Sequence, residues 1–312
     1  MKYLLLVILL LNLKAEAQDV VPTFTETSKS EVEKGIKTNR VVLTKVSNIP
    51  DEVYDAKNLI SLRIYESDSL KFVTKKIGNL ENLKALSIAN TSLKEMPKEV
   101  GNLKKLVDLE ITVNYMTGVP NEITGLRSLR SLDLSNSFLK ELPKNIGNLE
   151  NLETMIVNDN REQHRKLMPN FTPPVNPLEL PKSIGKLKKL KELSYRDNEL
   201  LQLPPEIGSL DSLTTLTLSN NSLTDLPKEI GKLSHLKVLF LDNNQLKTLP
   251  GEISGLTNLK ILHLEKNKLT HLPQGLEQLK QLRGLWLDEN NIPEVEILKL
   301  KAKLPNTKFV NN

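Results

Sequence analysis

The chain has no cysteine among its 312 residues. Disulfide bonds and cysteine-based zinc sites are therefore excluded, and so is attachment of a lipid to an N-terminal cysteine. The four histidines are not spaced as a tetrahedral zinc set, and the sequence has no D-x-D-x-D-G calcium loop. We expect no metal site and no cofactor.

Aromatic residues are also scarce, at 4% of the sequence with a single tryptophan. An aromatic-rich core is excluded, so leucine must supply most of the buried surface. Catalytic signatures are missing as well. The sequence has no glycine-rich phosphate loop, no nucleophile elbow and no zinc-binding helix motif. We therefore expect a protein that is not an enzyme.

Charge of one sign does not dominate, since 43 Lys and Arg stand against 38 Asp and Glu, for a net charge of +5. The basic residues are spread through the chain rather than gathered in one segment. This distribution is typical of a solvated surface and not of a nucleic-acid interface. We do not expect nucleic acid as a partner.

Long apolar runs are confined to the first residues. Tyr3–Leu13 is almost unbroken in its apolar character, follows Lys2, and precedes the small-x-small tripeptide Ala15–Ala17. This order is typical of a signal peptide, and a bilayer span needs roughly 20 residues. We predict a signal peptide at 1–17, a mature chain that begins at Gln18 without a transmembrane segment, and export to the periplasm, the surface or the medium.

What the sequence does contain is an internal repeat in which nearly all steps from one unit to the next are equal. Units that begin at Leu213, Leu236 and Leu259 read L-x-x-L-x-L-x-x-N-x-L-x-x-L-P. A fixed period predicts a solenoid of about 11 units, in which each unit buries its apolar face against its neighbours. The expected units begin at Ile36, Leu59, Leu83, Leu106, Leu129, Leu152, Leu190, Leu213, Leu236, Leu259 and Leu282.

Each part of a unit predicts a local structure. The L-x-L pair predicts a short strand, and stacked strands form a parallel sheet. The asparagine that recurs at Asn221, Asn244 and Asn267 is expected to bond backbone groups that are buried at the bend. The proline predicts the start of a short helical or 3₁₀ turn, and a glycine such as Gly231 is expected to end it through its permissive backbone.

The repeat has one long interruption and two irregular ends. The step from Leu152 to Leu190 exceeds the usual step by more than half, which predicts an insertion near 161–177. Such a loop either takes part in ligand recognition or varies in sequence at little energetic cost, and the sequence favours neither. We expect an N-terminal cap at 18–35, repeats over 36–295, and a C-terminal cap at 296–312 made of a helix and a tail.

Two segments carry a specific resemblance. LLQLPPEIGSL (200–210) and LTDLPKEIGKL (223–233) resemble the 23-residue class of leucine-rich repeat proteins, in particular the exported bacterial ones. The resemblance implies an α/β solenoid: a curved arc with a parallel sheet on the concave face and short helical or 3₁₀ turns on the convex face. It also implies a concave face that binds other macromolecules, with adhesion or host interaction as the commonest role.

Residues between the strand leucines are predicted to project from the concave face. Phe240, His263 and Trp286 share one register on neighbouring strands and would form a row beside carboxylates. An exposed apolar row rimmed by charge is typical of an interaction site, although cross-strand stacking alone would also stabilise a sheet. The predicted partner-binding residues are Val238, Phe240, Asp242, Ile261, His263, Glu265, Trp286 and Asp288.

A second and weaker set lies nearer the N-terminus. Its members are Asp108, Glu110, Tyr115, Asp133 and Phe138, with the two aromatic residues at strand exits. They would bind a basic partner, or form a solvated edge.

These patterns predict a non-catalytic binding module with a protein ligand on its concave face. The alternative ligand is a glycan or a cell-envelope polymer, because aromatic faces also stack on sugar rings and carboxylates accept hydroxyl hydrogens. The sequence makes no prediction of the oligomeric state.

Overall fold

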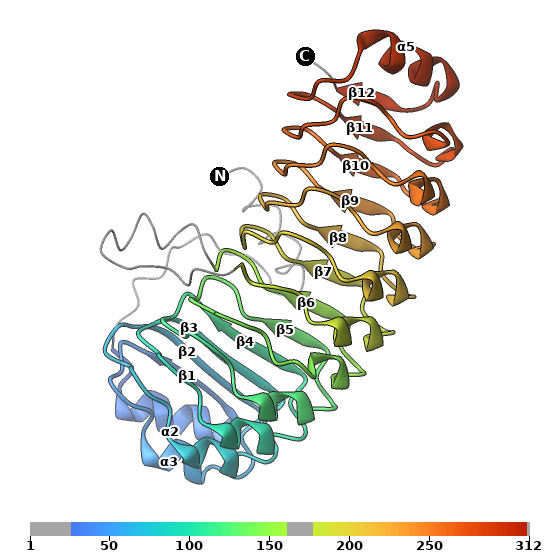
Figure 1. Ribbon diagram of the computed structural model, residues 1–312. Helices are drawn as coiled ribbons and strands as arrows, with labels where there is room; N and C mark the ends of the chain where they lie inside the picture. Colours follow the sequence, from blue (N-terminus) through green and yellow to red (C-terminus); the bar gives the residue numbers. More distant parts are fainter. Residues whose placement is uncertain (1–25, 161–176, 311–312) are drawn as a thin grey trace.

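The computed structural model describes residues 26–160 and 177–310 (Figure 1). The predicted signal peptide at 1–17 and its cleavage site therefore lie outside the described residues. So does the predicted insertion, apart from Pro177 at its end. None of the helices in the described ranges is both long and apolar enough to cross a membrane.

The repeats form one open, 12-stranded parallel sheet in which the strands follow chain order (Figure 1). The strands are β1 (Arg40–Thr44), β2 (Ser61–Ser67), β3 (Ala85–Thr91), β4 (Asp108–Thr112), β5 (Ser131–Asp133), β6 (Thr154–Ile156), β7 (Glu192–Ser194), β8 (Thr215–Thr217), β9 (Val238–Phe240), β10 (Ile261–His263), β11 (Gly284–Trp286) and β12 (Lys308–Val310). The predicted parallel sheet is confirmed.

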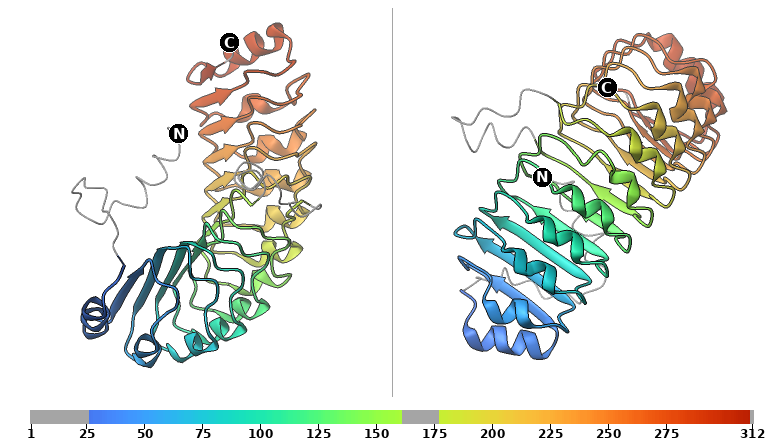
Figure 2. Two further views of the ribbon diagram at one scale, coloured as in Figure 1. Left: turned by 90° about the vertical axis from the view of Figure 1, so that its left-hand side faces the viewer. Right: turned by 60° about the horizontal axis from the view of Figure 1, so that its bottom comes forward.

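The sheet lies along the concave side of the arc and the turns along its convex side (Figure 2). The 3₁₀ turns span Lys75–Asn79, Lys98–Asn102, Asn121–Gly125, Ile146–Asn148, Lys182–Lys186, Pro205–Ser209, Lys228–Lys232, Gly251–Gly255 and Leu276–Gln278. Most of them follow a proline with extended backbone, such as Pro227 at φ −64° and ψ 142°. This confirms the predicted place of the proline at the start of these turns, whereas Thr74, Asn145 and Gly275 precede the other three.

Register along the sheet follows the repeat. Leu262 of β10 pairs with Leu239 of β9 and with Leu285 of β11, and all three are fully buried. One face of every strand is therefore fixed in the core, because a slip of one residue would expose its leucines. The residues between them are held on the concave surface.

The asparagine ladder is confirmed. Asn244 donates hydrogen bonds from Nδ2 to the carbonyl oxygens of Leu218 and Leu241, both at 3.0 Å, and its Oδ1 accepts from the Leu223 amide at 3.1 Å. The side chain is buried and satisfies backbone groups of its own unit and of the preceding one.

The predicted role of the turn glycine was wrong. Gly231 does not have a positive φ; among the described glycines only Gly275 does, at 90°. A Cβ added at Gly231 would instead lie 2.0 Å from the carbonyl oxygen of Glu252 in the next unit. The glycine is needed because neighbouring turns pack backbone against backbone, and not because the turn needs a left-handed residue.

The first unit begins later than predicted. Ile36, expected to start it, lies in helix α2 (Lys29–Lys37), which Ser28 and Glu31 open with a capping box. Val41 of β1 pairs with Leu62, so the step between these two strands is slightly shorter than the usual step of the repeat. Helix α3 (Asp51–Asp55) takes the place of a 3₁₀ turn in this unit.

The C-terminal end holds more structure than predicted. Helix α5 (Glu294–Lys303) covers the last unit with Ile297 and Leu300, whereas Leu298 is 54% exposed. The predicted tail forms β12, which pairs Phe309 with Leu285 and extends the sheet by one strand.

Candidate functional site

Phe240, His263 and Trp286 form a continuous stack on the concave face, here called the aromatic row. Each occupies the last position of its strand, and the ladder of β9, β10 and β11 aligns them. The ring centroids of Phe240 and His263 are 4.7 Å apart, and those of His263 and Trp286 are 3.9 Å apart with an interplanar angle of 9°. All three side chains are partly exposed.

The indole of Trp286 also rests over its own strand. A Cβ added at Gly284 would lie 2.4 Å from Cζ3 of the indole. The missing side chain at Gly284 therefore gives the ring its place on the concave surface. Sequence reasoning missed the role of Gly284, because the contact depends on the tilt of the indole.

Three carboxylates follow the aromatic row at the next outward position of each unit: Asp242, Glu265 and Asp288, here called the acidic row. Nδ1 of His263 lies 2.8 Å from Oε1 of Glu265, so the two rows are in contact. Oε2 of Glu265 is buried and has no hydrogen-bond partner. Ser219 of the preceding unit donates a hydrogen bond to Oδ1 of Asp242 at 2.5 Å.

The surroundings of Asp242 disfavour its ionised form. Burial raises the pKa of this carboxyl above its ordinary value, and the nearby charge of Glu265 raises the pKa further. The Ser219 hydroxyl acts in the opposite direction. A cation placed beside Asp242 would favour its ionised form.

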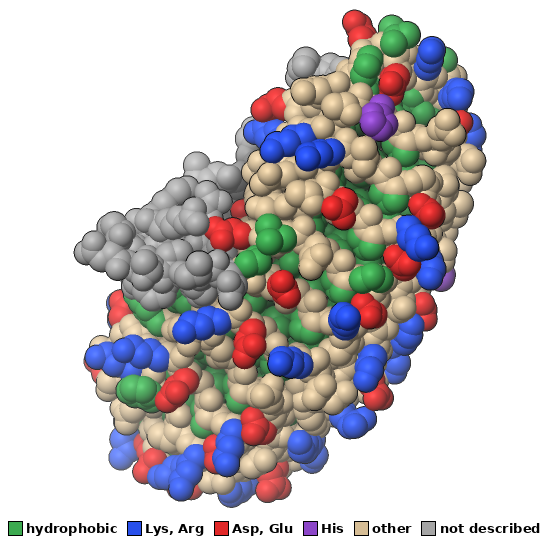
Figure 3. Space-filling model, in the orientation of Figure 1, with side chains coloured by type: hydrophobic (Ala, Val, Ile, Leu, Met, Phe, Trp, Pro, Cys, Tyr) green, Lys and Arg blue, Asp and Glu red, His purple; other side chains and the backbone are tan. Residues whose placement is uncertain are grey.

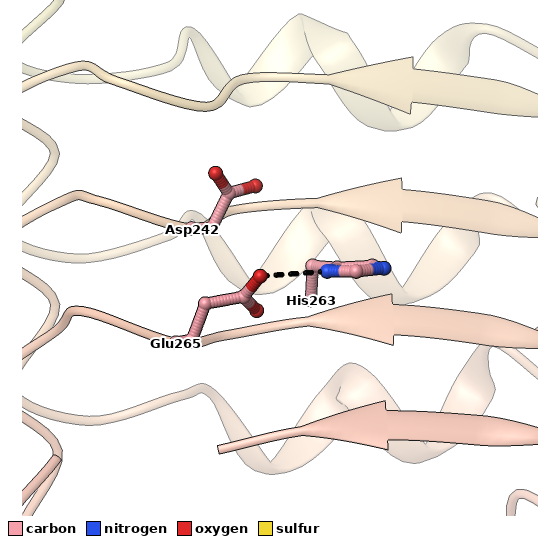
Figure 4. A group of neighbouring side chains, drawn as sticks. All are labelled: Asp242, His263 and Glu265. Carbon is pink, nitrogen blue, oxygen red and sulfur yellow. Dashed lines mark hydrogen bonds and ion pairs between the residues drawn. The ribbon is translucent and has the colours of Figure 1, made fainter. Parts of the chain in front are cut away.

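Asp242, His263 and Glu265 each offer one ligand atom within 4.8 Å of the others, a grouping that could hold a metal ion. Sequence analysis predicted no metal site and missed this group, because its members come from two strands. Figure 4 shows Glu265 turned toward His263 and Asp242 turned away from that pair. As placed, Nδ1 of His263 and Oε1 of Glu265 bond to each other, and Oδ1 of Asp242 accepts a hydrogen bond from Ser219.

Val238 and Ile261 occupy the outward positions at the starts of β9 and β10, and both are half-buried. They continue the surface of the aromatic row toward the strand starts. The predicted partner-binding residues thus lie together on three adjacent strands.

The second predicted set is centred on β4 and β5, where Glu110 pairs directly with Asp133. Oε2 of Glu110 accepts a hydrogen bond from Ser87 at 2.6 Å, and Oδ1 of Asp133 accepts one from the Ser135 amide at 2.9 Å. Burial raises the pKa of Asp133 to about 6, and the charge of Glu110 adds to this effect. Burial also raises the pKa of Asp108.

The aromatic pair of this set is only half accessible. Tyr115 is 40% exposed and stacks on Phe138 with 5.8 Å between ring centroids. Phe138 itself is 3% exposed, so its prediction as a surface residue was wrong. A large apolar ring at this position folds inward under Tyr115, where most later units carry polar side chains such as Ser222 and Gln245.

On the face drawn in Figure 3, basic and acidic side chains are interspersed between strips of apolar side chains. Side chains of both charge signs are therefore mixed on this face.

A family model described as a leucine-rich repeat region matches residues 55–172 and 215–302. A search of curated protein sequences gave no match.

Among solved structures, the plant peptide hormone receptor RGFR1, in complex with RGF2, is similar at a TM-score of 0.65 and 26% identity, over 85% of this chain and 46% of that one. The Arabidopsis receptor kinase HAESA, in complex with the peptide hormone IDA and the co-receptor SERK1, has a TM-score of 0.63 and 26% identity, over 88% and 46%. The chain thus spans less than half of either plant receptor chain.

An internalin, InlF of Listeria monocytogenes, has a TM-score of 0.67 and 20% identity, over 90% of this chain and 83% of that one. This likeness concerns the fold.

Proposed function

Because the chain belongs to the leucine-rich repeat family, we propose that it is a non-catalytic binding module whose concave face holds a protein ligand. The observation that carries the proposal is the aromatic row, a partly exposed stack rimmed by carboxylates. Aromatic side chains at the centre of a contact surface supply a large share of binding energy in protein complexes.

Two further observations support a protein ligand. The two plant structures at 26% identity hold peptide hormones. The concave face also runs over twelve strands, which is long enough for an ordinary interface of about 1,600 Å² in total. A glycan would need only the aromatic row and the acidic row beside it.

The role of the module is adhesion or recognition outside the cell that makes it. The sequence pattern at 1–17 supports export. N-terminal sequencing of the protein recovered from envelope and medium of the source cell tests this step. A chain that begins at Gln18 agrees with export, and a chain recovered only from the cytoplasm with Met1 in place contradicts it.

Capture on the immobilised chain tests the ligand class. The baits are the native chain, the Phe240→Ala/Trp286→Ala variant, and Phe72→Ala as a matched control, since Phe72 is 58% exposed but lies outside the aromatic row. Serum, matrix extract and the envelope of the source cell supply the ligands. Circular dichroism checks that each bait is folded.

A ligand that the native chain and Phe72→Ala retain, and that the double variant loses, agrees with the proposal. Protease treatment should destroy it. A ligand destroyed by periodate but not by protease would make the protein a glycan binder. Equal retention by all three baits would contradict a concave-face site at the aromatic row.

A further inference from the structure

The concave face is acidic along β4–β11, all of which the structure describes. Its outward positions are those that flank each pair of buried strand residues. The acidic residues at these positions are Asp108, Glu110, Asp133, Glu192, Asp242, Glu265 and Asp288. Arg196 is the one Lys or Arg among them, and its Nε lies 2.8 Å from Oδ2 of Asp197. The chain as a whole carries +5, so this face has the opposite sign.

Three basic residues beside β9–β11 stand at the other edge of this face, whereas Lys266 follows Glu265 and its Nζ lies 3.7 Å from Oε1 of Glu289. Lys237, Lys260 and Arg283 precede the outward positions of β9, β10 and β11 and are exposed. Lys237 is five residues from Asp242, or about 16 Å along an extended strand. Salt screens charges beyond about 8 Å at physiological ionic strength, so this edge does not neutralise the acidic row.

Three of the carboxylates on this face accept hydrogen bonds from hydroxyl or amide groups, and Glu265 contacts the His263 ring. Ser87 donates to Glu110, the Ser135 amide donates to Asp133, and Ser219 donates to Asp242. Burial raises the pKa of Glu192 and of Asp242. A cationic ligand beside these carboxylates would stabilise their ionised form.

The aromatic row adds a preference among cations. A guanidinium is planar, stacks on aromatic faces and pairs with a carboxylate through two N–H donors, whereas an ammonium does neither as well. His263 lies between Phe240 and Trp286 in the stack, so a guanidinium would stack on the outer ring face at either end of the row. Asp242 and Asp288 occupy the next outward positions of the same two units. This combination fits arginine.

We propose that the concave face binds a cationic segment of polypeptide, with an arginine stacked on the aromatic row and paired with the acidic row. The proposal rests on the proposed function, because it specifies the chemistry of the protein ligand. It assigns the acidic set on β4 and β5 to the same ligand.

Defined peptides test the proposal with the full chain in 0.15 M salt. The probe is an acetylated and amidated octapeptide of alternating arginine and serine. Two matched peptides carry lysine, or the uncharged isostere citrulline, in place of arginine. Calorimetry measures affinity, and the emission of Trp286, the only tryptophan, reports contact at the row.

We expect the arginine peptide to bind several-fold more tightly than the lysine peptide and the citrulline peptide not to bind measurably. Asp242→Asn/Asp288→Asn should weaken the arginine peptide about tenfold. The matched control Glu150→Gln/Asp211→Asn removes two exposed carboxylates at the turns and should change affinity less than about twofold. Phe240→Ala/Trp286→Ala should abolish the preference for arginine over lysine.

An asparagine still accepts the Ser219 hydrogen bond, so Asp242→Asn should fold, and a thermal melt verifies it. Equal binding of the citrulline peptide, or equal weakening by the control variant, would overturn the proposal. A captured protein that needs the aromatic row but is acidic at its contact site would leave the proposed function standing and remove this inference. Binding abolished by a chelator would assign the carboxylates to a metal instead.

Discussion

The indole of Trp286 covers Gly284 so closely that a methyl group at residue 284 would come within 2.4 Å of the ring. The position of the only tryptophan thus depends on the absence of a side chain two residues earlier on the same strand. Gly284 does not have a positive φ, so an alanine there meets the ring without backbone strain.

Gly284→Ala is expected to lift the indole off the strand and break its stack on His263. Tryptophan emission should shift, and the arginine peptide should bind several-fold more weakly, while the unfolding midpoint changes little. Gly251→Ala is the matched control, because a Cβ there meets nothing within 4 Å. An unchanged emission spectrum in Gly284→Ala would contradict this account of the site.

Gly231→Ala is expected to destabilise the solenoid, since its Cβ would lie 2.0 Å from the Glu252 carbonyl oxygen. Forcing a methyl group between two packed backbones costs about 1–3 kcal/mol. Gly251→Ala should be neutral or stabilise by about 0.5 kcal/mol through the unfolded chain. Urea unfolding followed by circular dichroism measures both, and similar midpoints for the two variants would show that the turns separate freely.

Asn244→Ala is expected to lower stability by about 2–4 kcal/mol, because it leaves buried backbone groups of two neighbouring units without partners. Asn258→Ala is the control: its exposed side chain also donates to a carbonyl oxygen of the preceding unit, that of Ser234. Water replaces that bond, so the loss should stay below about 1 kcal/mol. Thermal melts that do not separate the two variants would rule out the ladder as a source of stability.

Asp133 should make stability depend on pH in a defined direction. Its pKa is raised from 3.8 to about 6, so the folded chain binds a proton more tightly than the unfolded chain between these values. Stability therefore falls as pH rises from about 4 to 6, by at most about 3 kcal/mol.

Asp133→Asn should remove this contribution, because an amide oxygen still accepts the Ser135 amide hydrogen bond and carries no charge. The variant should match the native chain near pH 4 and exceed it in unfolding free energy at pH 7.5. Asp211→Asn, at an exposed carboxylate, should show no such divergence. A difference between Asp133→Asn and the native chain that stays constant with pH would contradict the raised pKa.

The regular part of this fold could be predicted from the sequence because each unit has the same neighbours as the next. The strand leucines, the ladder asparagine and the proline before each turn report local environments that recur once in every unit. The register of Phe240, His263 and Trp286 follows from the same period, so their alignment on the sheet was also predictable.

What the period could not predict depends on contacts between units or at the ends. The packing of Gly231 against Glu252 lies in neither unit alone. The burial of Phe138 depends on its stacking against Tyr115 of the preceding unit. At the N-terminus the capping box of Ser28 and Glu31 starts a helix that runs through Ile36, so the repeat begins only after this helix.

Because the strands follow chain order, two sites on the concave face are separated by a whole number of strand spacings. Four steps of about 4.8 Å separate β5, which carries Asp133, from β9, which carries Phe240, or about 19 Å. An extended peptide covers that distance with about six residues. Gain or loss of one repeat unit between the two sites would change the length of ligand needed to reach both by one strand spacing. The side chains of each site would stay the same.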